Sequence, residues 1–474
     1  MEKISIVWLR QDLRTEDHPA LDAALKRGKV VPLYIWSPAE EGNWPLGGAS
    51  KWWLHHSLKS LENELRLLGL PLIIRQGKSL DVLKKVIQET HADAVFWSRR
   101  YEPESIKRDI EVKSHLTEHK ILAKSFKGNL LYEPWTIQNK QGKPFQVFTY
   151  FWKACLNQEQ DFPLLAAPVP AKGKPIEIES QSLESLELLP KTSWDEGLAH
   201  TWKPGSCYAK EFITYFLEGG AADYENRRDR PDLPGVSRLS PYLHFGEVSI
   251  RTLWNNVVER LGAEQGECYL RQLGWREFAH HLLYHFPQTP LEPLRSEFGH
   301  FPWEDEERFL KAWQKGLTGF PFIDAGMRQL WMTGWMHNRV RMVTGSFLVK
   351  DLLQPWQKGA KWFWDTLVDA DLANNTLGWQ WVAGCGADAA PYFRIFNPIT
   401  QGEKFDPEGS YVRKWIPELA QLPNKWIHHP WDAPADVLLK AGVTLGDTYP
   451  YPLVNHDEAR VKALEAFEEI KALK

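Results

Sequence analysis

The first 130 residues alternate short apolar runs with amphipathic segments of helical period. The apolar runs, which we expect to be strands, are Ile4–Leu9, Val30–Trp36, Leu70–Arg75, Ala92–Trp97 and Ile121–Phe126. Helical patterns between them include Ala20–Lys26, Lys51–Leu67 and Leu80–Glu89. Nearly continuous apolar strands separated by helices predict a doubly wound parallel sheet covered on both faces. Such a sheet binds ligands beyond the carboxyl ends of its strands.

Glycine patterns argue against dinucleotide binding of the usual kind. The turn after the first predicted strand reads RQDLRTED and has no glycine fingerprint. One GxGxxA match, GCGADA at 384–389, follows WQWVA in a helical region without a strand unit around it. We treat that match as chance, and a flavin oxidoreductase that uses NAD(P)H is disfavoured.

The rest of the chain predicts two further regions. Residues 131–202 are rich in Pro, Ser, Glu and Lys with weak periodicity, which predicts a long, mostly irregular linker. Residues 203–474 carry helical signals to the end, and we expect an all-α domain there. The predicted helices include Tyr208–Leu217, Val248–Leu261, Cys268–His285, Glu306–Lys315, Ile323–Trp335, His337–Leu353 and His456–Lys474. The expected fold is therefore an α/β domain (1–130), a linker and a helical domain.

Composition narrows the classes of protein that the chain can belong to. Its four cysteines are far apart and form no CxxC pair, which argues against zinc and disulfides and favours a reducing cytoplasm. No apolar run is long enough to cross a membrane, and the N-terminus lacks the order of a signal peptide. The net charge of −4 gives no overall attraction to nucleic acid, but it leaves room for a local basic face.

The stretch Asp369–Trp381 (DADLANNTLGWQW) gathers two acids, adjacent asparagines and two tryptophans, in a chain with 24 tryptophans. Tryptophan is large and is seldom fully buried. Indoles beside polar amides favour a cavity for a flat ring or a redox path. A helical bundle that packs with tryptophan explains the same pattern, and the stretch alone does not separate the two.

Five motifs in a fixed order give the chain a family resemblance. DADLANNTLGWQW, RIFNPITQGEKFD (394–406), TGWMHNRVRM (333–342), LGWREF (273–278) and VSRLS (236–240) together resemble the photolyase/cryptochrome family. The resemblance starts at WLRQDLR (8–14), covers essentially the whole chain and is strongest to bacterial cyclobutane-dimer photolyases of class I or class III. It implies an antenna domain, a linker and a helical domain that binds FAD.

The resemblance assigns the cofactor site residue by residue. The residues implied to hold FAD are Tyr224, Val236, Ser237, Arg238, Leu239, Ser240, Arg341, Asp369, Asp371 and Asn375. The segment 236–240 matches the phosphate-binding part, where hydroxyls and N–H groups that open a helix suit phosphate oxygens. Val236 stands where the family often has Thr, so one hydroxyl is lost. Arg341 matches the partner of Asp369.

Tryptophans and basic residues are implied to serve electron transfer and DNA binding. Trp379, Trp356 and Trp303 match the chain that photoreduces FAD. The lesion pocket is implied to contain Gln272, Trp275, Asn338, Met342 and Trp381 beside the flavin and Asn375. The implied DNA contacts are Arg228, Gln272, Trp275, Arg276, Asn338, Arg339, Arg394 and Gln401, to a dimer flipped out of the duplex, for which photolyases are a standard example.

Four positions bear on which member of the family this is. Asn375 matches the residue that faces flavin N5; plant cryptochromes have Asp there, so Asn favours a photolyase. The (6-4) photolyases carry histidines where Asn338 and Met342 stand, which favours cyclobutane dimers. Gln272 departs from the Glu of cyclobutane photolyases and matches the (6-4) enzymes. A cryptochrome-like blue-light receptor and a (6-4) photolyase therefore remain alternatives.

An antenna chromophore is the last expectation from the resemblance. Glu102 resembles a residue that binds a pterin, and Trp44 and Gly48–Trp53 flank the same region. The chromophore would be methenyltetrahydrofolate or a deazaflavin. The resemblance further implies a cytoplasmic monomer with UV-damaged DNA as its partner, no metal, no membrane association and no obligate protein partner.

Overall fold

The structure is a computed structural model that describes residues 3–158, 160–171 and 174–471. It divides into two compact units. Unit 1 consists of Met1–Ala222, Ser237–Pro287 and Val368–Leu372, and unit 2 consists of Asp223–Val236, Gln288–Leu367 and Ala373–Lys474. The chain thus crosses between the units several times, and the domain boundaries expected at 130 and 202 stay a prediction.

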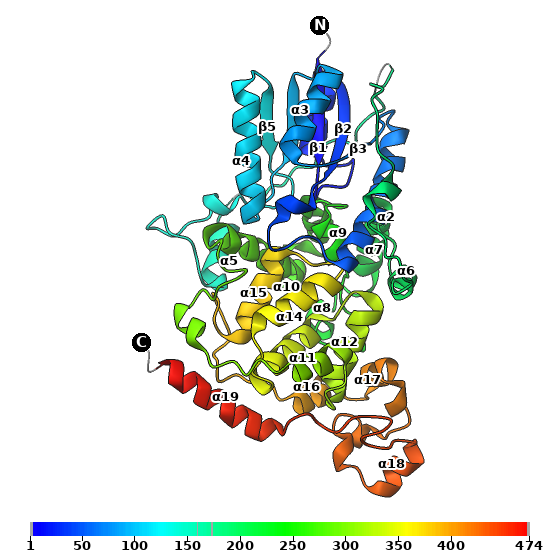
Figure 1. Cartoon of the computed structure of the whole chain (residues 1–474), viewed down its shortest axis with the longest axis vertical. Coiled ribbons are helices and arrows are strands. Elements are labelled where there is room, and N and C mark those ends of the chain that lie inside the picture. The colour runs from blue at the N-terminus through cyan, green and yellow to red at the C-terminus, as the bar shows by residue number, and fades with distance from the viewer. Residues whose placement is uncertain (1–2, 159, 172–173, 472–474) are drawn as a thin grey trace. The chain divides into compact units, whose positions relative to one another are not determined.

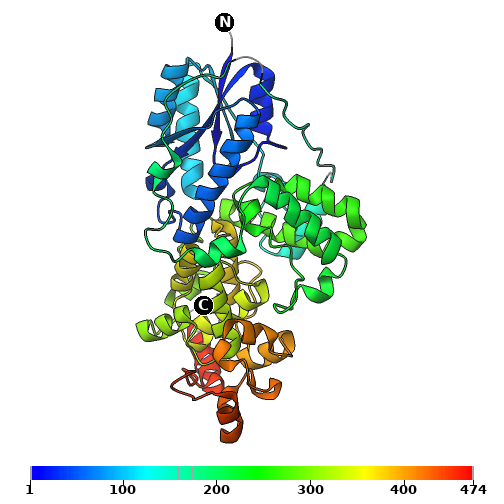
Figure 2. The same cartoon turned by 90° about the vertical axis from the view of Figure 1, so that its right-hand side faces the viewer.

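Unit 1 contains a five-stranded parallel sheet with helices on both faces (Figure 1, Figure 2). Its strands are β1 (Ile4–Leu9), β2 (Lys29–Trp36), β3 (Ile73–Gln76), β4 (Ala94–Ser98) and β5 (Leu122–Phe126). Their order is β3-β2-β1-β4-β5, with Ile4 opposite Lys29 and Ser5 opposite Ala94. The expected parallel sheet is confirmed, and its topological switch point lies between β1 and β4.

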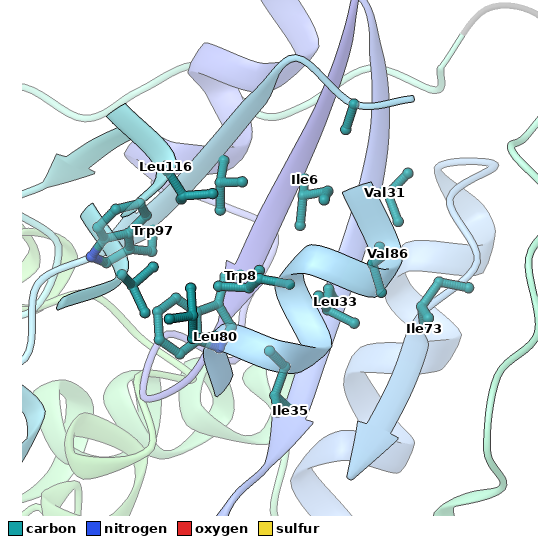
Figure 3. Packing of buried hydrophobic residues seen from close by; sticks show 14 residues of the cluster. Ile6, Trp8, Val31, Leu33, Ile35, Ile73, Leu80, Val86, Trp97 and Leu116 are labelled. Atoms are coloured by element: carbon teal, nitrogen blue, oxygen red, sulfur yellow. The ribbon is translucent and has the colours of Figure 1, made fainter. Parts of the chain in front are cut away.

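Strands β1, β2 and β4 are buried on both faces because their side chains are mostly apolar in both directions, whereas the edge strand β5 is partly exposed. On one face, Ile6 and Trp8 of β1 pack against Leu83 of α3 and Leu116 of α4 in one core cluster (Figure 3). Burial of each aliphatic side chain of this kind contributes roughly 1.5–3 kcal/mol. On the other face, α1 contacts β1, β2 and β4.

The helices of unit 1 both cover the sheet and build a separate helical part. They are α1 (Pro19–Arg27), α2 (Gly48–Leu67), α3 (Ser79–Thr90), α4 (Pro103–Glu118), α5 (Phe148–Leu156), α6 (Glu196–Thr201), α7 (Ser206–Gly219), α9 (Ser240–His244) and α10 (Ile250–His285). Two predicted helices, Val248–Leu261 and Cys268–His285, are joined in α10 across a kink at Gly262.

The described residues of 131–202 are mostly irregular, as expected, but they include helix α5, which the sequence pattern did not predict. Phe148, Phe151 and Trp152 are buried in it and pack on α10. A Cβ at Gly274 of α10 would lie 2.5 Å from the Trp152 ring, so this glycine allows the close approach. The apolar side of a nine-residue helix was obscured by the polar sequence that follows it.

Unit 2 is helical in the described residues. Its helices are α8 (Tyr224–Arg227), α11 (Glu307–Lys315), α12 (Pro321–Thr333), α13 (Asn338–Ser346), α14 (Trp356–Thr366), α16 (Pro398–Phe405), α17 (Ser410–Trp415), α18 (Ala435–Ala441) and α19 (His456–Lys471), with most of α15 (Leu372–Ala383). The predicted helix His337–Leu353 is split into α13 and a π-helical segment, η5 (Phe347–Asp351). The predicted end of the last helix, 472–474, lies outside the described residues.

The turn after β1 joins the sheet to the α9–α10 connection within unit 1. Leu13 N–H donates to the Phe245 carbonyl (3.0 Å), and the Arg14 guanidinium donates to the Gly246 carbonyl (2.9 Å). Gly246 has φ of +68°, and a Cβ there would lie 2.1 Å from the Gln11 carbonyl oxygen. The turn that lacks a nucleotide fingerprint therefore has a structural role: it fixes α9 beside the carboxyl ends of the strands.

Candidate functional site

Asp371 lies in unit 1 between two buried histidines. The Nδ1 atom of His244 is 3.3 Å from Asp371 Oδ2, and the Nε2 atom of His280 is 3.6 Å from the same oxygen. Burial alone would raise the pKa of the Asp371 carboxyl, but the charge of His280 and the hydrogen bond from His244 outweigh it and hold that pKa well below its usual range. Burial lowers the pKa of His280. Asp371 is therefore an ionised carboxylate in the protein interior.

Residues 237–240 form a polar turn that contacts Asp369, two residues before Asp371. The Ser240 hydroxyl donates to Asp369 (2.6 Å), and the Tyr269 hydroxyl donates to Ser237 (3.0 Å). Arg238 has φ of +55°, in the left-handed region that costs a non-glycine residue roughly 1–2 kcal/mol. Burial lowers the pKa of its guanidinium. A strained, partly buried arginine beside hydroxyls suits a phosphate ligand.

Three predicted lesion or DNA residues lie within two turns of α10. The Trp275 ring stacks on Phe148 (3.8 Å, 7°), which covers one ring face and leaves the side chain half-buried. The Gln272 amide donates to the Cys268 carbonyl one turn earlier (3.1 Å), and Arg276 donates to the Asn129 carbonyl (2.7 Å). The helix thus brings Gln272, Trp275 and Arg276 together, and their contacts with a lesion or with DNA stay predictions.

A pocket in unit 1 lies at the carboxyl ends of β1, β2 and β4, where the fold predicts a ligand. It encloses roughly 610 Å³ with its open mouth included. Its lining includes Trp8, Arg10, Tyr34, Glu41, Arg100, Arg108 and His244. Glu102, the predicted antenna residue, is not in the lining but pairs with Arg100 (3.0 Å), which also pairs with Glu41. Burial alone would raise the pKa of Glu102, but the charge of Arg100 outweighs burial and lowers that pKa to about 2.

Asn375 is held by α14 in unit 2. Its Nδ2 atom donates to the Ala360 carbonyl (3.0 Å). A carbonyl oxygen accepts only, so this contact fixes which end of the amide is nitrogen. The Oδ1 atom is consequently the acceptor end that Asn375 presents elsewhere.

The three predicted electron-transfer tryptophans all lie in unit 2. Trp379 and Trp356 are buried, and Trp303 is half-buried. A Cβ at Gly359 would lie 2.1 Å from Trp379 Cη2, so the Trp379 ring rests on α14 one turn after Trp356. Two buried indoles and one partly exposed indole fit a path from the interior to the surface.

Helix α13 carries the residues predicted to discriminate the lesion. Asn338 and Met342 are one turn apart, with Asn338 Nδ2 3.8 Å from Met342 Sδ. Arg339 pairs with Asp229 (2.8 Å), and the Arg341 Nε atom donates to the Met336 carbonyl (2.7 Å). The predicted pairing of Arg341 with Asp369 joins different units and stays a prediction.

The remaining predicted residues of unit 2 differ in exposure. Trp381 stacks loosely on Phe396 (6.5 Å, 23°) and is half-buried. Arg394 is exposed, whereas Gln401 is half-buried in α16. The Arg228 guanidinium lies 5.5 Å from the ring of Tyr224.

Sequence reasoning missed His244, His280 and Trp313. Trp313 is fully buried and lies 6.1 Å from Trp379. Both histidines approach Asp371 only through the tertiary fold, from α9 and α10. Single histidines on helices give no signal of their own. The one hint in the sequence was that His244 comes two residues before Gly246, where the chain turns.

Comparison with known proteins gives the class of this chain. Residues 5–173 match the family model described as DNA photolyase, and residues 269–469 match the FAD binding domain of DNA photolyase. The chain is 45% identical over 471 residues to the deoxyribodipyrimidine photo-lyase of Agrobacterium fabrum, with 98% of each chain covered. It is 42% identical over 486 residues to Cryptochrome-1 of Arabidopsis thaliana, covering 98% of this chain and 70% of the cryptochrome.

A solved structure agrees with these matches. The crystal structure of a bacterial class III photolyase from Agrobacterium tumefaciens superposes with a TM-score of 0.96 at 45% identity, covering 100% of this chain and 98% of that chain. The chain belongs to the photolyase/cryptochrome family, and FAD is its cofactor. The Ser237 hydroxyl, which accepts from Tyr269 and keeps its own proton, and the guanidinium of Arg238 fit the phosphates of that group. In the described residues no helix is long and apolar enough to span a membrane.

Proposed function

We propose that this chain is a deoxyribodipyrimidine photo-lyase that repairs cyclobutane pyrimidine dimers in DNA by light-driven electron transfer. Bound reduced FAD supplies the light-absorbing electron donor. The electron passes to a flipped-out dimer, the two bonds of the cyclobutane ring break, and the electron returns, so the reaction has no net redox change. The 45% identity to a photo-lyase and the geometry of Asn375 support this function over a blue-light receptor.

Asn375 is the observation that carries the proposal. Its N–H group is engaged by the Ala360 carbonyl, so the Oδ1 atom is the end available to flavin N5. An amide oxygen accepts a hydrogen bond but gives up no proton. An aspartic acid at this position, in contrast, could protonate N5. The amide oxygen can therefore accept from the N–H group that N5 carries in the reduced, anionic flavin, and it adds no proton to that flavin.

The choice of cyclobutane dimers over (6-4) photoproducts rests on α13. Asn338 and Met342 provide an amide and a thioether on one face of the helix. His337, the only histidine adjacent to them in sequence, is buried and caps α13 by accepting from Arg339 N–H (3.2 Å). Burial lowers the pKa of His337 to about 4, so it is a neutral cap. An acid-base histidine pair would need different residues.

Gln272 is compatible with dimer repair because an amide carries N–H donors where a protonated Glu would carry an O–H donor. A hydrogen bond to a charged group contributes about 1.5–3 kcal/mol, and most of this survives in an amide. What Gln272 cannot supply is a proton. We therefore expect the wild-type chain to repair a thymine dimer and the Gln272→Glu variant to repair it with a changed quantum yield. A wild-type chain that leaves the dimer intact with its FAD reduced would refute the proposed function.

The experiment on Asn375 compares two neighbouring asparagines. Wild type, Asn375→Asp and Asn374→Asp are reduced, mixed with an oligonucleotide that contains one dimer, and exposed to blue light or kept dark. Repair should be lost in Asn375→Asp and retained in Asn374→Asp, which makes the same charge change at an exposed neighbour. Equal repair by Asn375→Asp and wild type would contradict the role of the amide.

We also propose that the pocket of unit 1 holds the antenna. Three buried donors in its lining, Trp8 Nε1, Arg10 Nε and Arg108 Nη2, have no hydrogen-bond partner among the described residues. Unpaired buried donors are costly and call for acceptor oxygens on a ligand. Trp8 and Tyr34 offer ring faces to a planar chromophore such as methenyltetrahydrofolate or a deazaflavin.

The antenna proposal has its own test. The wild-type chain purified in the dark should carry a near-ultraviolet absorbance band besides that of FAD. Arg108→Leu should lose this band and keep FAD, since Arg108 is in the sheet part of unit 1. An identical spectrum in wild type and variant would refute the assignment.

Assembly and location complete the proposal. We infer a cytoplasmic monomer that binds UV-damaged DNA without an obligate protein partner. Light scattering of the holoenzyme tests the first point: a mass near twice 54.9 kDa would refute the monomer.

A further inference from the structure

His244 faces two sites within unit 1. It lines the pocket at the carboxyl ends of the strands, and its Nδ1 atom lies 3.3 Å from Asp371. The residue is 5% exposed, and its Nε2 atom has no hydrogen-bond partner among the described residues. His244 is thus a buried side chain between the pocket and Asp371, and only one of its two ring nitrogens has a hydrogen-bond partner among the described residues.

The contact with Asp371 determines the chemistry of the unused atom. An ionised carboxylate accepts hydrogen bonds and donates none, so the proton of neutral His244 is on Nδ1. Nε2 then carries a lone pair. That lone pair can accept a hydrogen bond from an N–H group of a pocket ligand, or it can take up a proton. The two events exclude each other.

We propose that His244 is a positioning residue that couples the pocket to the flavin. A ligand N–H group that donates to Nε2 keeps His244 neutral. A neutral His244 compensates less of the negative charge that reduction adds near Asp371, so the bound ligand disfavours reduction of the flavin. The proposal rests on the proposed function, because it takes Asp371 to lie beside FAD and the pocket to hold a heteroaromatic antenna. The pocket ligand would then carry an N–H donor for His244. It would also carry acceptor atoms for the unpaired donors of Trp8, Arg10 and Arg108.

The surrounding charges give the sign of the coupling. Asp371 faces His244 from the loop before α15. His280 and Arg276 act on Asp371 from α10. The charge of Glu102, at the start of α4, also acts on Asp371. On the pocket side, Glu41 and Arg100 form an ion pair. Reduction of the flavin adds negative charge beside Asp371 and favours protonated His244. A ligand that needs the Nε2 lone pair should therefore bind the reduced holoenzyme more weakly than the oxidised one.

Linkage makes this measurable as a ratio of affinities. If the pocket ligand weakens on reduction, it makes the flavin harder to reduce by the same factor. We expect the ratio to be about fivefold, the low end of coupling between two sites.

The experiment titrates methenyltetrahydrofolate into FAD-loaded holoenzyme by anaerobic equilibrium dialysis, once with oxidised and once with reduced FAD. His244→Asn keeps an amide N–H where Nδ1 stood and removes the Nε2 end. The ratio should fall to one, with binding to oxidised enzyme weakened by roughly two- to tenfold, the contribution of one hydrogen bond. His281→Asn is the matched control: that histidine donates from Nδ1 to the Pro134 carbonyl and does not contact Asp371.

The possible results distinguish the coupling from the antenna assignment and from the photolyase function. A wild-type ratio that His281→Asn keeps and His244→Asn abolishes supports the coupling. A wild-type ratio of one, tighter binding to the reduced enzyme, or an unchanged ratio in His244→Asn overturns it. Folate that does not bind wild type overturns the coupling and a folate antenna, while dimer repair by the same preparation leaves the photolyase function intact.

Discussion

Replacing Gly359 with alanine should damage the electron path without touching a tryptophan. Gly359 is in the first turns of α14, and its missing side chain makes room for the Trp379 ring. A Cβ there would lie 2.1, 2.5 and 2.6 Å from three atoms of that ring. Carbon atoms in contact are normally about 3.5–4.0 Å apart, so the ring would have to move by roughly 1 Å or more.

The neighbours of the ring decide the energetic cost. Trp379 is flanked by Phe363 (5.0 Å) and Trp313 (6.1 Å), and both are buried, so the ring has no free space to enter. Overpacking of this kind costs about 1–3 kcal/mol. Alanine returns roughly 0.5–1 kcal/mol through its better helix propensity. With the middle of both ranges, the net loss of unfolding free energy should be about 1 kcal/mol.

Two measurements test this reasoning. Urea unfolding should show the loss of stability, and FAD photoreduction under blue light with an external thiol should be slower than in wild type. Gly219→Ala is the control, because nothing lies within 4 Å of a Cβ at that helical glycine. A Gly359→Ala variant as stable as Gly219→Ala, with unchanged photoreduction, would refute the packing of Trp379 on α14.

Three further predictions follow from single residues. Trp379→Phe should abolish photoreduction yet leave repair by chemically reduced enzyme intact; loss of both would contradict a role in photoreduction alone. Glu277 accepts from Leu131 and Tyr132 N–H (both 3.0 Å), and burial raises its pKa to about 7, above the unfolded value of 4.5. The folded state therefore holds the proton more tightly, and this group should lower stability as pH rises from about 4.5 to 7, by up to about 1.4 kcal/mol per pH unit. Urea midpoints of Glu277→Gln should flatten in that window, and an unchanged slope would contradict it. Arg394→Ala should weaken DNA binding and lower the salt slope by about 1, and an unchanged slope in a filter-binding series would exclude a phosphate contact.

The sheet was predictable because its signal is local. Five apolar runs between helices define it, and all five were found with shifts of a few residues. The third strand begins at Ile73 rather than Leu70, because Pro71 lacks an N–H for the ladder. Helix α5 was missed because its apolar side is only apparent once it packs on α10.

The site was predictable where a motif carries it and not where only the fold assembles it. Gln272, Trp275 and Arg276 share α10 because they are close in sequence. His244 and His280 are 36 positions apart and meet only at Asp371. Their approach depends on the docked turn at Gly246, and no local pattern of residues encodes such a contact.

One turn of α14 connects the two functions that the sequence assigns separately to Asn375 and Trp379. The Ala360 carbonyl fixes the amide of Asn375, and the adjacent Gly359 receives the ring of Trp379. A carbonyl oxygen within reach of Asn375 and a residue without a side chain for Trp379 are requirements on neighbouring positions of the same backbone. A displacement of α14 at this turn would therefore disturb the acceptor offered to flavin N5 and the first step of photoreduction together. This is why Gly359→Ala should slow photoreduction and also reduce repair, whereas Trp379→Phe should affect photoreduction alone.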